Sequence, residues 1–221
     1  MTLLTARQHA APGHERPPAI SVVIPTLNGG SRLLHLLAAV DRQRVTGGDV
    51  EVLIADSGST DGSIERAIGL HRGLRLFDVE RGRFDHGLVR AALVDQARAP
   101  LVALFSQDAV PQGTDYLSAL AAPFVMPDVA GAMARQVPRP GADPLQTREL
   151  ERWTPPDPRP YLVRRSPPGA GSLPAAERMR LARFDNVASM VRRCHALALP
   201  FPSRSFGEDI AWGWAQLETG H

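Results

Sequence analysis

Apolar residues in the first half of the chain alternate between two patterns. Short, nearly continuous apolar runs, such as VEVLIA at residues 50–55, are typical of strands covered on both faces. Between them, leucine and valine recur at the three- and four-residue intervals of an amphipathic helix. The patterns predict strands at residues 19–24, 50–55, 74–79 and 101–105, and helices at residues 31–40, 63–71 and 87–98. Such alternation predicts an α/β, Rossmann-like fold: a mostly parallel sheet with helices on both faces.

The second half is less regular. It predicts helices at residues 115–124 and 208–217 and strands at residues 129–135 and 186–192. Residues 138–174 are rich in proline, glycine and arginine, which predicts a long loop with one helix near residues 145–152. Ser31 is expected to be the N-cap of the first helix.

The composition fits one domain over residues 19–221, preceded by a flexible tail over residues 1–18. The tail has no apolar core typical of a secretory signal, and the longest apolar runs are too short to cross a membrane. The lone cysteine, Cys194, excludes an intrachain disulfide and fits a cytoplasmic protein. All 25 basic residues are arginine, and the net charge is only +2 without a long basic run, which argues against nucleic-acid binding.

Polar residues gather where the predicted strands end. Ligands of open parallel sheets bind at the carboxyl ends of the strands, so these residues are expected to line one crevice. The candidate ligand-binding residues are Pro25, Thr26, Asn28, Asp56, Ser57, Ser59, Asp61, His86, Arg90, Gln107 and Asp108.

Each of these loops has a plainer interpretation as well. The segment from Asp56 to Gly62 has the residues of a turn and helix cap, but it could also bind a base, ribose or phosphate. His86 and Arg90 lie one helical turn apart and could reach one phosphate, or be a loop histidine and a solvated arginine. No G-x-G-x-x-G or P-loop pattern is present, which disfavours a dinucleotide cofactor.

Acidic residues provide the candidate chemistry. Asp108 either ends a strand in a turn or binds a divalent cation, Mg²⁺ or Mn²⁺, that neutralises a diphosphate leaving group. Glu208 and Asp209 begin the last helix, where acids favour the helix dipole. One of them could instead be a general base, because a helix N-terminus keeps a carboxylate ionised at pH 7.

Four segments together resemble the family 2 inverting glycosyltransferases. They are SVVIPTLNGG, VEVLIADSGSTDGS, LVALFSQDAVP and FGEDIAWGWAQLETGH, in this order, and the FDHG…R stretch and SQDAVP most resemble rhamnosyltransferase-type members. The resemblance implies a GT-A fold, with nucleotide contacts at Pro25, Thr26, Asn28, Asp56 and Ser57. It implies that Asp108 is the metal-binding Asp of a D-x-D motif and that Asp209, in the E-D motif, is the catalytic base.

The sequence departs from the family pattern in two places. The D-x-D position reads Ser106-Gln107-Asp108, so one carboxylate remains. Family members generally continue beyond the E-D helix, so the domain is expected to lack a C-terminal extension.

The resulting hypothesis is an inverting, metal-dependent transferase in bacterial surface polysaccharide synthesis. It would use a dTDP- or UDP-sugar donor and a saccharide or lipid-linked saccharide acceptor, at the inner face of the membrane if the arginine-rich residues 152–165 make a peripheral contact. Two alternatives remain open: a non-catalytic nucleotide-sugar-binding module, and an interaction domain that binds no nucleotide.

Overall fold

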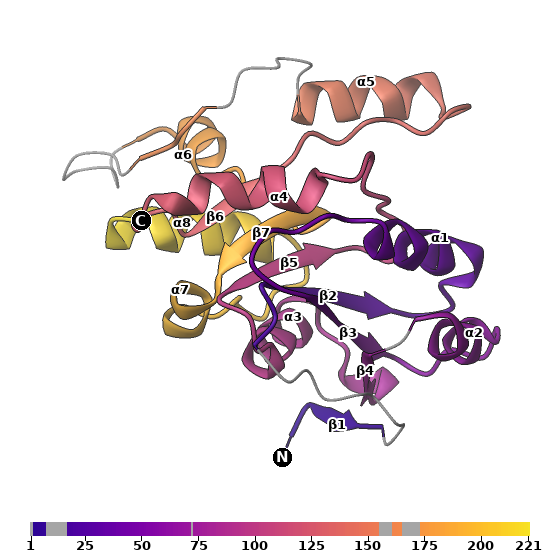
Figure 1. Ribbon diagram of the computed structural model, residues 1–221. Helices are drawn as coiled ribbons and strands as arrows, with labels where there is room; N and C mark the ends of the chain where they lie inside the picture. Colours follow the sequence, from indigo (N-terminus) through magenta and orange to yellow (C-terminus); the bar gives the residue numbers. More distant parts are fainter. Residues whose placement is uncertain (1, 8–16, 72, 155–160, 165–172) are drawn as a thin grey trace.

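The protein is built around one mixed sheet (Figure 1). The computed structural model describes residues 2–7, 17–71, 73–154, 161–164 and 173–221. Within these ranges seven strands lie in the order β1-β4-β3-β2-β5-β7-β6. They are β1 (Leu4–Ala6), β2 (Ile20–Thr26), β3 (Val50–Asp56), β4 (Leu74–Val79), β5 (Leu101–Phe105), β6 (Gly131–Met133) and β7 (Ala188–Arg192). The central strands β4, β3, β2 and β5 are parallel, whereas β1, β7 and β6 pair antiparallel.

Helices cover both faces of the sheet, as the sequence predicted. They are α1 (Gly30–Asp41), α2 (Ser63–Leu70), α3 (His86–Gln96), α4 (Tyr116–Ala121), α5 (Pro144–Trp153), α6 (Ala175–Leu181), α7 (Arg193–Ala198) and α8 (Glu208–Thr219), with 3₁₀ turns at Arg81–Arg83 and Ala122–Val125. Side chains alternate along a strand, so Val22 packs in a core with α1, α2 and α4. Its neighbour Val23 packs in a second core with α3, α7 and α8. Packing of helices on both faces of the sheet fixes the strand ends that carry the candidate site.

Several boundaries differ from the sequence-based predictions. Residues 4–6, expected in a flexible tail, form β1 on β4, and α6 and α7 were not predicted. The prediction of Ser31 as N-cap is wrong, because α1 begins at Gly30 after Gly29, which makes no side-chain cap. Instead, the carboxylate of Asp61 accepts the Gly30 N–H at 2.8 Å, so a neighbouring loop satisfies this helix end. Residues 8–16 of the expected tail, and residues 155–160 and 165–172 of the expected long loop, lie outside the described residues.

The antiparallel strand β7 brings the late part of the chain to the carboxyl edge of the parallel strands. Its first residue, Ala188, pairs with Phe105, the last residue of β5. Just beyond, the Ser106 N–H donates to the Val187 carbonyl at 3.0 Å. The residues that precede β7 therefore lie beside the loop that follows β5.

Candidate active site at the carboxyl edge of the sheet

Gln107 joins the loops that follow β2 and β5. Its side-chain oxygen accepts hydrogen bonds from the Thr26 hydroxyl at 2.5 Å and from the Leu27 N–H at 3.0 Å. Its amide nitrogen donates to the Leu27 carbonyl at 3.3 Å. Gln107, predicted as a ligand-binding residue, thus holds the β2 loop in place through its side chain.

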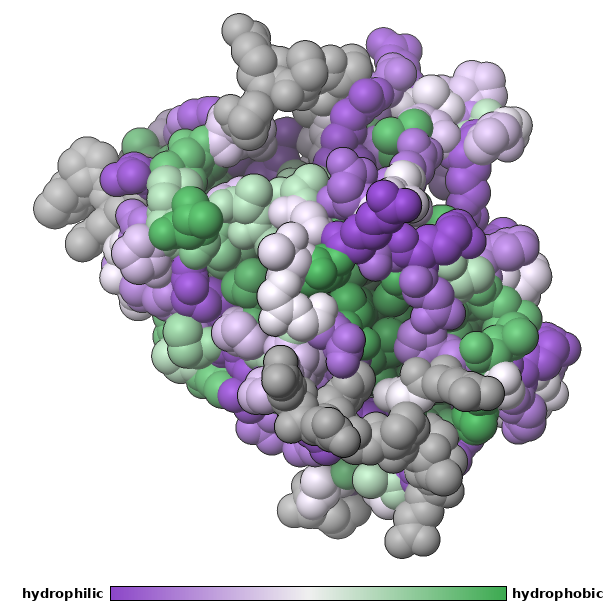
Figure 2. Space-filling view, in the orientation of Figure 1, coloured by the Kyte–Doolittle hydropathy of each residue, from purple (hydrophilic) through white to green (hydrophobic). Residues whose placement is uncertain are grey.

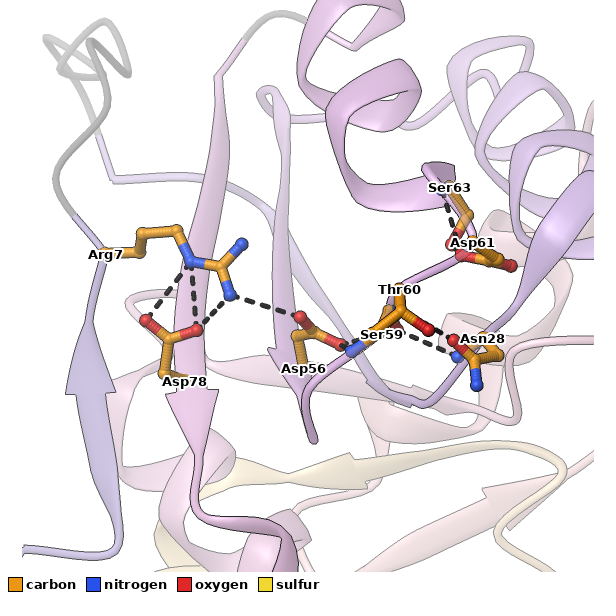
Figure 3. Close-up of polar contacts among 8 residues, drawn as sticks. All are labelled: Arg7, Asn28, Asp56, Ser59, Thr60, Asp61, Ser63 and Asp78. Atoms are coloured by element: carbon orange, nitrogen blue, oxygen red, sulfur yellow. Dashed lines mark hydrogen bonds and ion pairs between the residues drawn. The ribbon is translucent and has the colours of Figure 1, made fainter.

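Asn28 makes the corresponding connection to the loop after β3. Its N–H donates to the Ser59 hydroxyl at 2.8 Å, and its side-chain oxygen accepts the Thr60 N–H at 2.9 Å (Figure 3). Asn28 has a φ of 49°, in the left-handed region that asparagine tolerates better than most residues. Asp61 accepts from the Ser63 N–H and hydroxyl, which lowers the pKa of this exposed carboxyl. Three predicted loops are therefore linked into one surface.

Asp56 ends β3 and is almost completely buried, with Ser57 buried beside it. One carboxylate oxygen accepts from the Ser59 N–H at 3.0 Å and from its hydroxyl at 2.6 Å. The other accepts from Arg7 at 3.1 Å, and Arg7 also forms a two-oxygen pair with Asp78 on β4 (Figure 3). The hydrogen bond to Asp78 is the main factor that raises the pKa of Arg7. Arg7 was not predicted from the sequence, because it lies in a segment expected to be flexible.

Asp108 lies between two arginines. Its carboxylate is 3.1 Å from the Arg139 guanidinium and 3.9 Å from that of Arg32 in α1. Arg139 also donates to the Asp108 carbonyl. Neither arginine was singled out from the sequence, because nothing in an isolated arginine marks it as an ion-pair partner.

A divalent cation fits Asp108 only with help from another ligand. Within the described ranges, no group of three or more His, Cys, Asp or Glu side chains could hold a metal ion. The Asp108 side chain is 41% exposed and offers one carboxylate. Mg²⁺ is commonly bound by one or two carboxylates together with substrate phosphates. This donor chemistry fits a cation carried by a diphosphate and does not fit one held by protein alone.

Glu208 and Arg90 form a buried pair between α8 and α3. Their side chains are 3.4 Å apart, and the Asn186 amide donates to the same Glu208 oxygen at 3.3 Å. Burial lowers the pKa of Arg90, against the effect of the nearby carboxylates. His86 lies on the same side of α3, with Nδ1 3.3 Å from the Arg90 guanidinium. Arg90, predicted as a phosphate contact, therefore has a different partner in this structure: it neutralises Glu208.

Asp209 carries the second carboxylate at the start of α8, next to Glu208. The Ile210 N–H donates to it at 2.8 Å and the Asn186 N–H at 3.4 Å. Its pKa is raised, first by burial and then by the charges of Glu208 and Asp185, while the two N–H groups act in the opposite direction. The sequence predicted that the helix N-terminus favours the ionised form; the structure shows burial working against it.

A continuous chain of contacts joins Asp209 to the Asp108 loop. Asp209 accepts from the Asn186 N–H, and the next residue, Val187, accepts from the Ser106 N–H at the end of β5. Asp108 follows two residues later. The two candidate carboxylates are thus carried on adjoining segments at one edge of the sheet.

Asp185 is a further polar centre that the sequence did not reveal. Its side chain is buried and accepts hydrogen bonds from the Trp153 indole at 2.6 Å, the Val187 N–H at 2.7 Å and the Gln136 amide. Trp153 ends α5, so this carboxylate ties the irregular α5 region to the start of β7.

The family model for glycosyl transferase family 2 matches residues 21–186, which include β2 from its second residue, the strands β3 to β5 and the linked loops. The chain belongs to glycosyl transferase family 2. It is 30% identical over 127 residues to the O-antigen chain rhamnosyltransferase RfbN of Salmonella typhimurium, covering 57% of this chain and 40% of that protein. It is 29% identical over 225 residues to validoxylamine A glucosyltransferase of Streptomyces hygroscopicus subsp. limoneus, covering 92% and 47%. The chain therefore spans less than half the length of these curated relatives.

Solved structures of glycosyltransferases share the family 2 chain's fold. A mannosyltransferase from Pyrobaculum calidifontis in complex with GDP-Man and Mn²⁺ has a TM-score of 0.63 at 17% identity, over 90% of this chain and 51% of that one. Glucosyl-3-phosphoglycerate synthase from Mycobacterium tuberculosis, in complex with UDP, has a TM-score of 0.60 at 19% identity, over 88% and 64%. These likenesses confirm the predicted GT-A fold, and at such identities they show the fold alone.

Proposed function

We propose that this protein is an inverting glycosyltransferase that moves a sugar from a nucleoside-diphosphate donor to an acceptor hydroxyl. The observation that carries the proposal is the chain of contacts from Asp209 through Asn186 and Val187 to the loop of Asp108. It brings a candidate base and a candidate phosphate-side carboxylate to one edge of the sheet. Membership of glycosyl transferase family 2 supports the same reaction class.

The donor nucleotide is proposed to lie over the linked loops after β2 and β3. Pro25, Thr26, Asn28, Asp56 and Ser57 were predicted as its contacts, and the loops that contain them are held together by Asn28, Ser59 and Gln107. Ser57 supports this assignment, because its hydroxyl is buried with no hydrogen-bond partner among the described residues. A UDP or dTDP group is the proposed ligand, and the neighbours of known structure include one with UDP and one with GDP-Man.

Asp108 is proposed as the protein ligand of Mg²⁺ or Mn²⁺ that arrives with the donor. When bound, such a cation neutralises the charge that develops on the leaving diphosphate. A neighbour of known structure contains Mn²⁺ together with its GDP-Man, which supports a divalent cation for this family. His86, close to Arg90 at the start of α3, remains the candidate for a further phosphate contact.

Asp209 is proposed as the general base. Its carboxylate takes the proton of the acceptor hydroxyl while that oxygen bonds to the anomeric carbon, and the carbon–oxygen bond to the diphosphate breaks on the opposite face. The nucleoside diphosphate leaves with the bonding electrons, so the anomeric configuration inverts. Glu208 supports the base indirectly, because its pairing with Arg90 fixes the start of α8. Bases of this kind contribute about 10²–10⁴-fold to the rate.

A cavity beside α8 is the proposed entry for the acceptor. It has a volume of about 440 Å³ and lies between α6 and α8, with Gly207 and Ile210, on either side of the E-D pair, among its lining residues. Figure 2 shows hydrophobic residues beside hydrophilic ones at the upper left of the molecule, the side on which Figure 1 places α6 and α8. The apolar lining, which includes Trp214 and Met179, fits one face of a saccharide or the lipid of a lipid-linked saccharide.

The decisive experiment compares the wild type with Asp209→Asn. Both proteins are expected to bind UDP or dTDP equally in the presence of Mn²⁺, measured by calorimetry, while sugar transfer by the variant falls by 10²-fold or more. NMR of the product anomeric proton is expected to show inversion. If both proteins bind nucleotide and neither transfers or hydrolyses a sugar, the chain is a binding module; if neither binds, the nucleotide site is absent.

The cellular setting is part of the same proposal. We place the reaction in bacterial surface polysaccharide synthesis in the cytoplasm, with a peripheral contact at the membrane through the arginine-rich residues 152–165. Among the residues placed in the structure, none of the helices combines the length and apolar character needed to cross a bilayer. Sedimentation with anionic vesicles tests the contact, because arginines near such a surface give salt-sensitive binding.

A further inference from the structure

The Asp108 carboxylate lies in an unusual charge environment for a cation ligand. Arg139 and Arg32 both lie within 4 Å of it, so two positive charges surround one negative charge. The neighbouring Gln107 cannot compensate, because its side chain is neutral and is engaged with Thr26 and Leu27. A divalent cation that approaches alone meets a net positive site, whereas a diphosphate is attracted to it.

Arg139 is the arginine that competes directly with a cation. It lies 3.1 Å from the same carboxylate oxygen that Arg32 approaches at 3.9 Å, and it also binds the Asp108 carbonyl. Its side chain is 52% exposed and lies in the segment between β6 and α5, so it can turn toward a ligand without disturbing the core. Arginine is also well suited to phosphate, which accepts two parallel hydrogen bonds from its planar fork.

We propose that Arg139 makes cation binding at Asp108 conditional on the nucleotide diphosphate. With no nucleotide, Arg139 pairs with Asp108 and keeps a lone cation out. When the diphosphate enters, Arg139 transfers to a phosphate oxygen and leaves the carboxylate to the cation that arrives with the nucleotide. This inference rests on the proposed function, and it assigns Arg139 as a diphosphate-binding residue.

The proposal predicts effects of opposite sign for two ligands. In Arg139→Gln, Mn²⁺ alone is expected to bind about two- to fivefold more tightly, because an exposed ion pair no longer occupies Asp108. The same variant is expected to bind UDP or dTDP about tenfold more weakly in the presence of Mn²⁺, because a charge-assisted contact to phosphate is lost. The factor by which Mn²⁺ and the nucleotide strengthen each other's binding is the same in both directions, and it is expected to be smaller in Arg139→Gln than in the wild type.

Titration of Mn²⁺ by electron paramagnetic resonance, with and without each nucleotide, measures these constants. Formation of the Mn²⁺–nucleotide complex in buffer is measured separately and subtracted. Arg42→Gln is the matched control, because it removes the same charge at the C-terminal end of α1, the end opposite to Arg32. This variant is expected to bind both ligands as the wild type does. Arg139→Lys is expected to restore part of the nucleotide affinity through its charge.

Several results would overturn the inference. One is an Arg139→Gln variant with wild-type constants for both ligands. Another is weaker binding of both ligands, which would mean that Arg139 only holds Asp108 in position. A third is nucleotide binding by the wild type that Mn²⁺ leaves unchanged; in these three cases the proposed nucleotide site stands. If the wild type binds neither UDP nor dTDP, the proposed function fails and the inference fails with it.

Discussion

Gly87 allows the segment before α8 to approach the first turn of α3. A methyl carbon added at Gly87 would lie 2.0 Å from the carbonyl oxygen of Pro202 and 2.9 Å from its carbonyl carbon. Ordinary carbon contacts are about 3.5–4.0 Å, so one of two backbone segments must move by more than about 1 Å. The next residue of that segment, Ser203, donates to the Asp85 side chain at 2.7 Å, which ties it to the same turn. Gly87→Ala therefore pushes apart two elements that are otherwise bonded.

The cost follows from two opposing contributions. Overpacking typically destabilises by about 1–3 kcal/mol, and both atoms met here belong to backbone, which yields poorly. Replacement of glycine by alanine within a helix returns about 0.5–1 kcal/mol. With a cost in the upper half of the overpacking range, about 2–3 kcal/mol, the net loss is about 1–2.5 kcal/mol, which corresponds to a fall in Tm of about 2–10 °C for a chain of this size.

Gly69→Ala provides the matched control. Gly69 is also helical, in α2, and a methyl carbon there meets nothing within 4 Å. Thermal unfolding followed by circular dichroism is expected to show a higher Tm for Gly69→Ala and a lower one for Gly87→Ala. Equal Tm values for the two variants would refute the close approach of α3 and residue 202.

The remaining predictions concern two charged groups of the site. Asp209→Asn is expected to raise Tm at pH 8, since burial raises the pKa of Asp209 and the folded state therefore disfavours the ionised carboxylate. This penalty is fully present above the folded-state pKa of Asp209 and disappears below the unfolded-state value of about 4. The difference in Tm between the two proteins, measured by fluorimetric melting, should therefore vanish near pH 4. A difference in Tm that is constant with pH would contradict a raised pKa for Asp209. Arg7→Gln is expected to weaken nucleotide binding severalfold in calorimetry, because Asp56 loses a charged partner, and to cost about 1–3 kcal/mol of stability, because the buried Asp56 carboxylate is left with its Ser59 hydrogen bonds. Unchanged nucleotide affinity would mean that Arg7 serves the fold alone.

The central sheet could be predicted well from the sequence, because each of its strands is an apolar run whose pattern can be recognised from the local sequence alone. VEVLIA at residues 50–55 is covered on both faces wherever it lies, and the structure places it in β3. The strand β1 and the helix α6 carry no such local signal. Residues 4–6 become a strand only because β4 offers them an edge, and α6 lies on the surface with no buried residue.

The sequence predicted which loops form the candidate site, but it did not predict which side chains form ion pairs or hydrogen bonds within it. Glycine, serine and aspartate at strand ends mark loops that can bind a ligand, and Asn28 and Asp56 were found in this way. Arg7, Arg139 and Asp185 act through partners that are distant in sequence: Arg7 and Asp78 are 71 residues apart. No periodicity encodes such pairs, so only the folded structure reveals them.

These pairs indicate a structural role for the FDHG…R stretch, whose His86 and Arg90 were predicted from the sequence to contact phosphate. Asp85 accepts from Ser203, Gly87 lies against Pro202, and Arg90 pairs with Glu208, so three residues of one motif hold residues 202–208. That segment leads directly to Asp209, the proposed base. Asp85, Gly87 and Arg90 therefore position the start of α8, and their substitutions should lower kcat more than they weaken nucleotide binding. A phosphate-binding role for Arg90 predicts the opposite order, so the two measurements on Arg90→Lys discriminate between the roles.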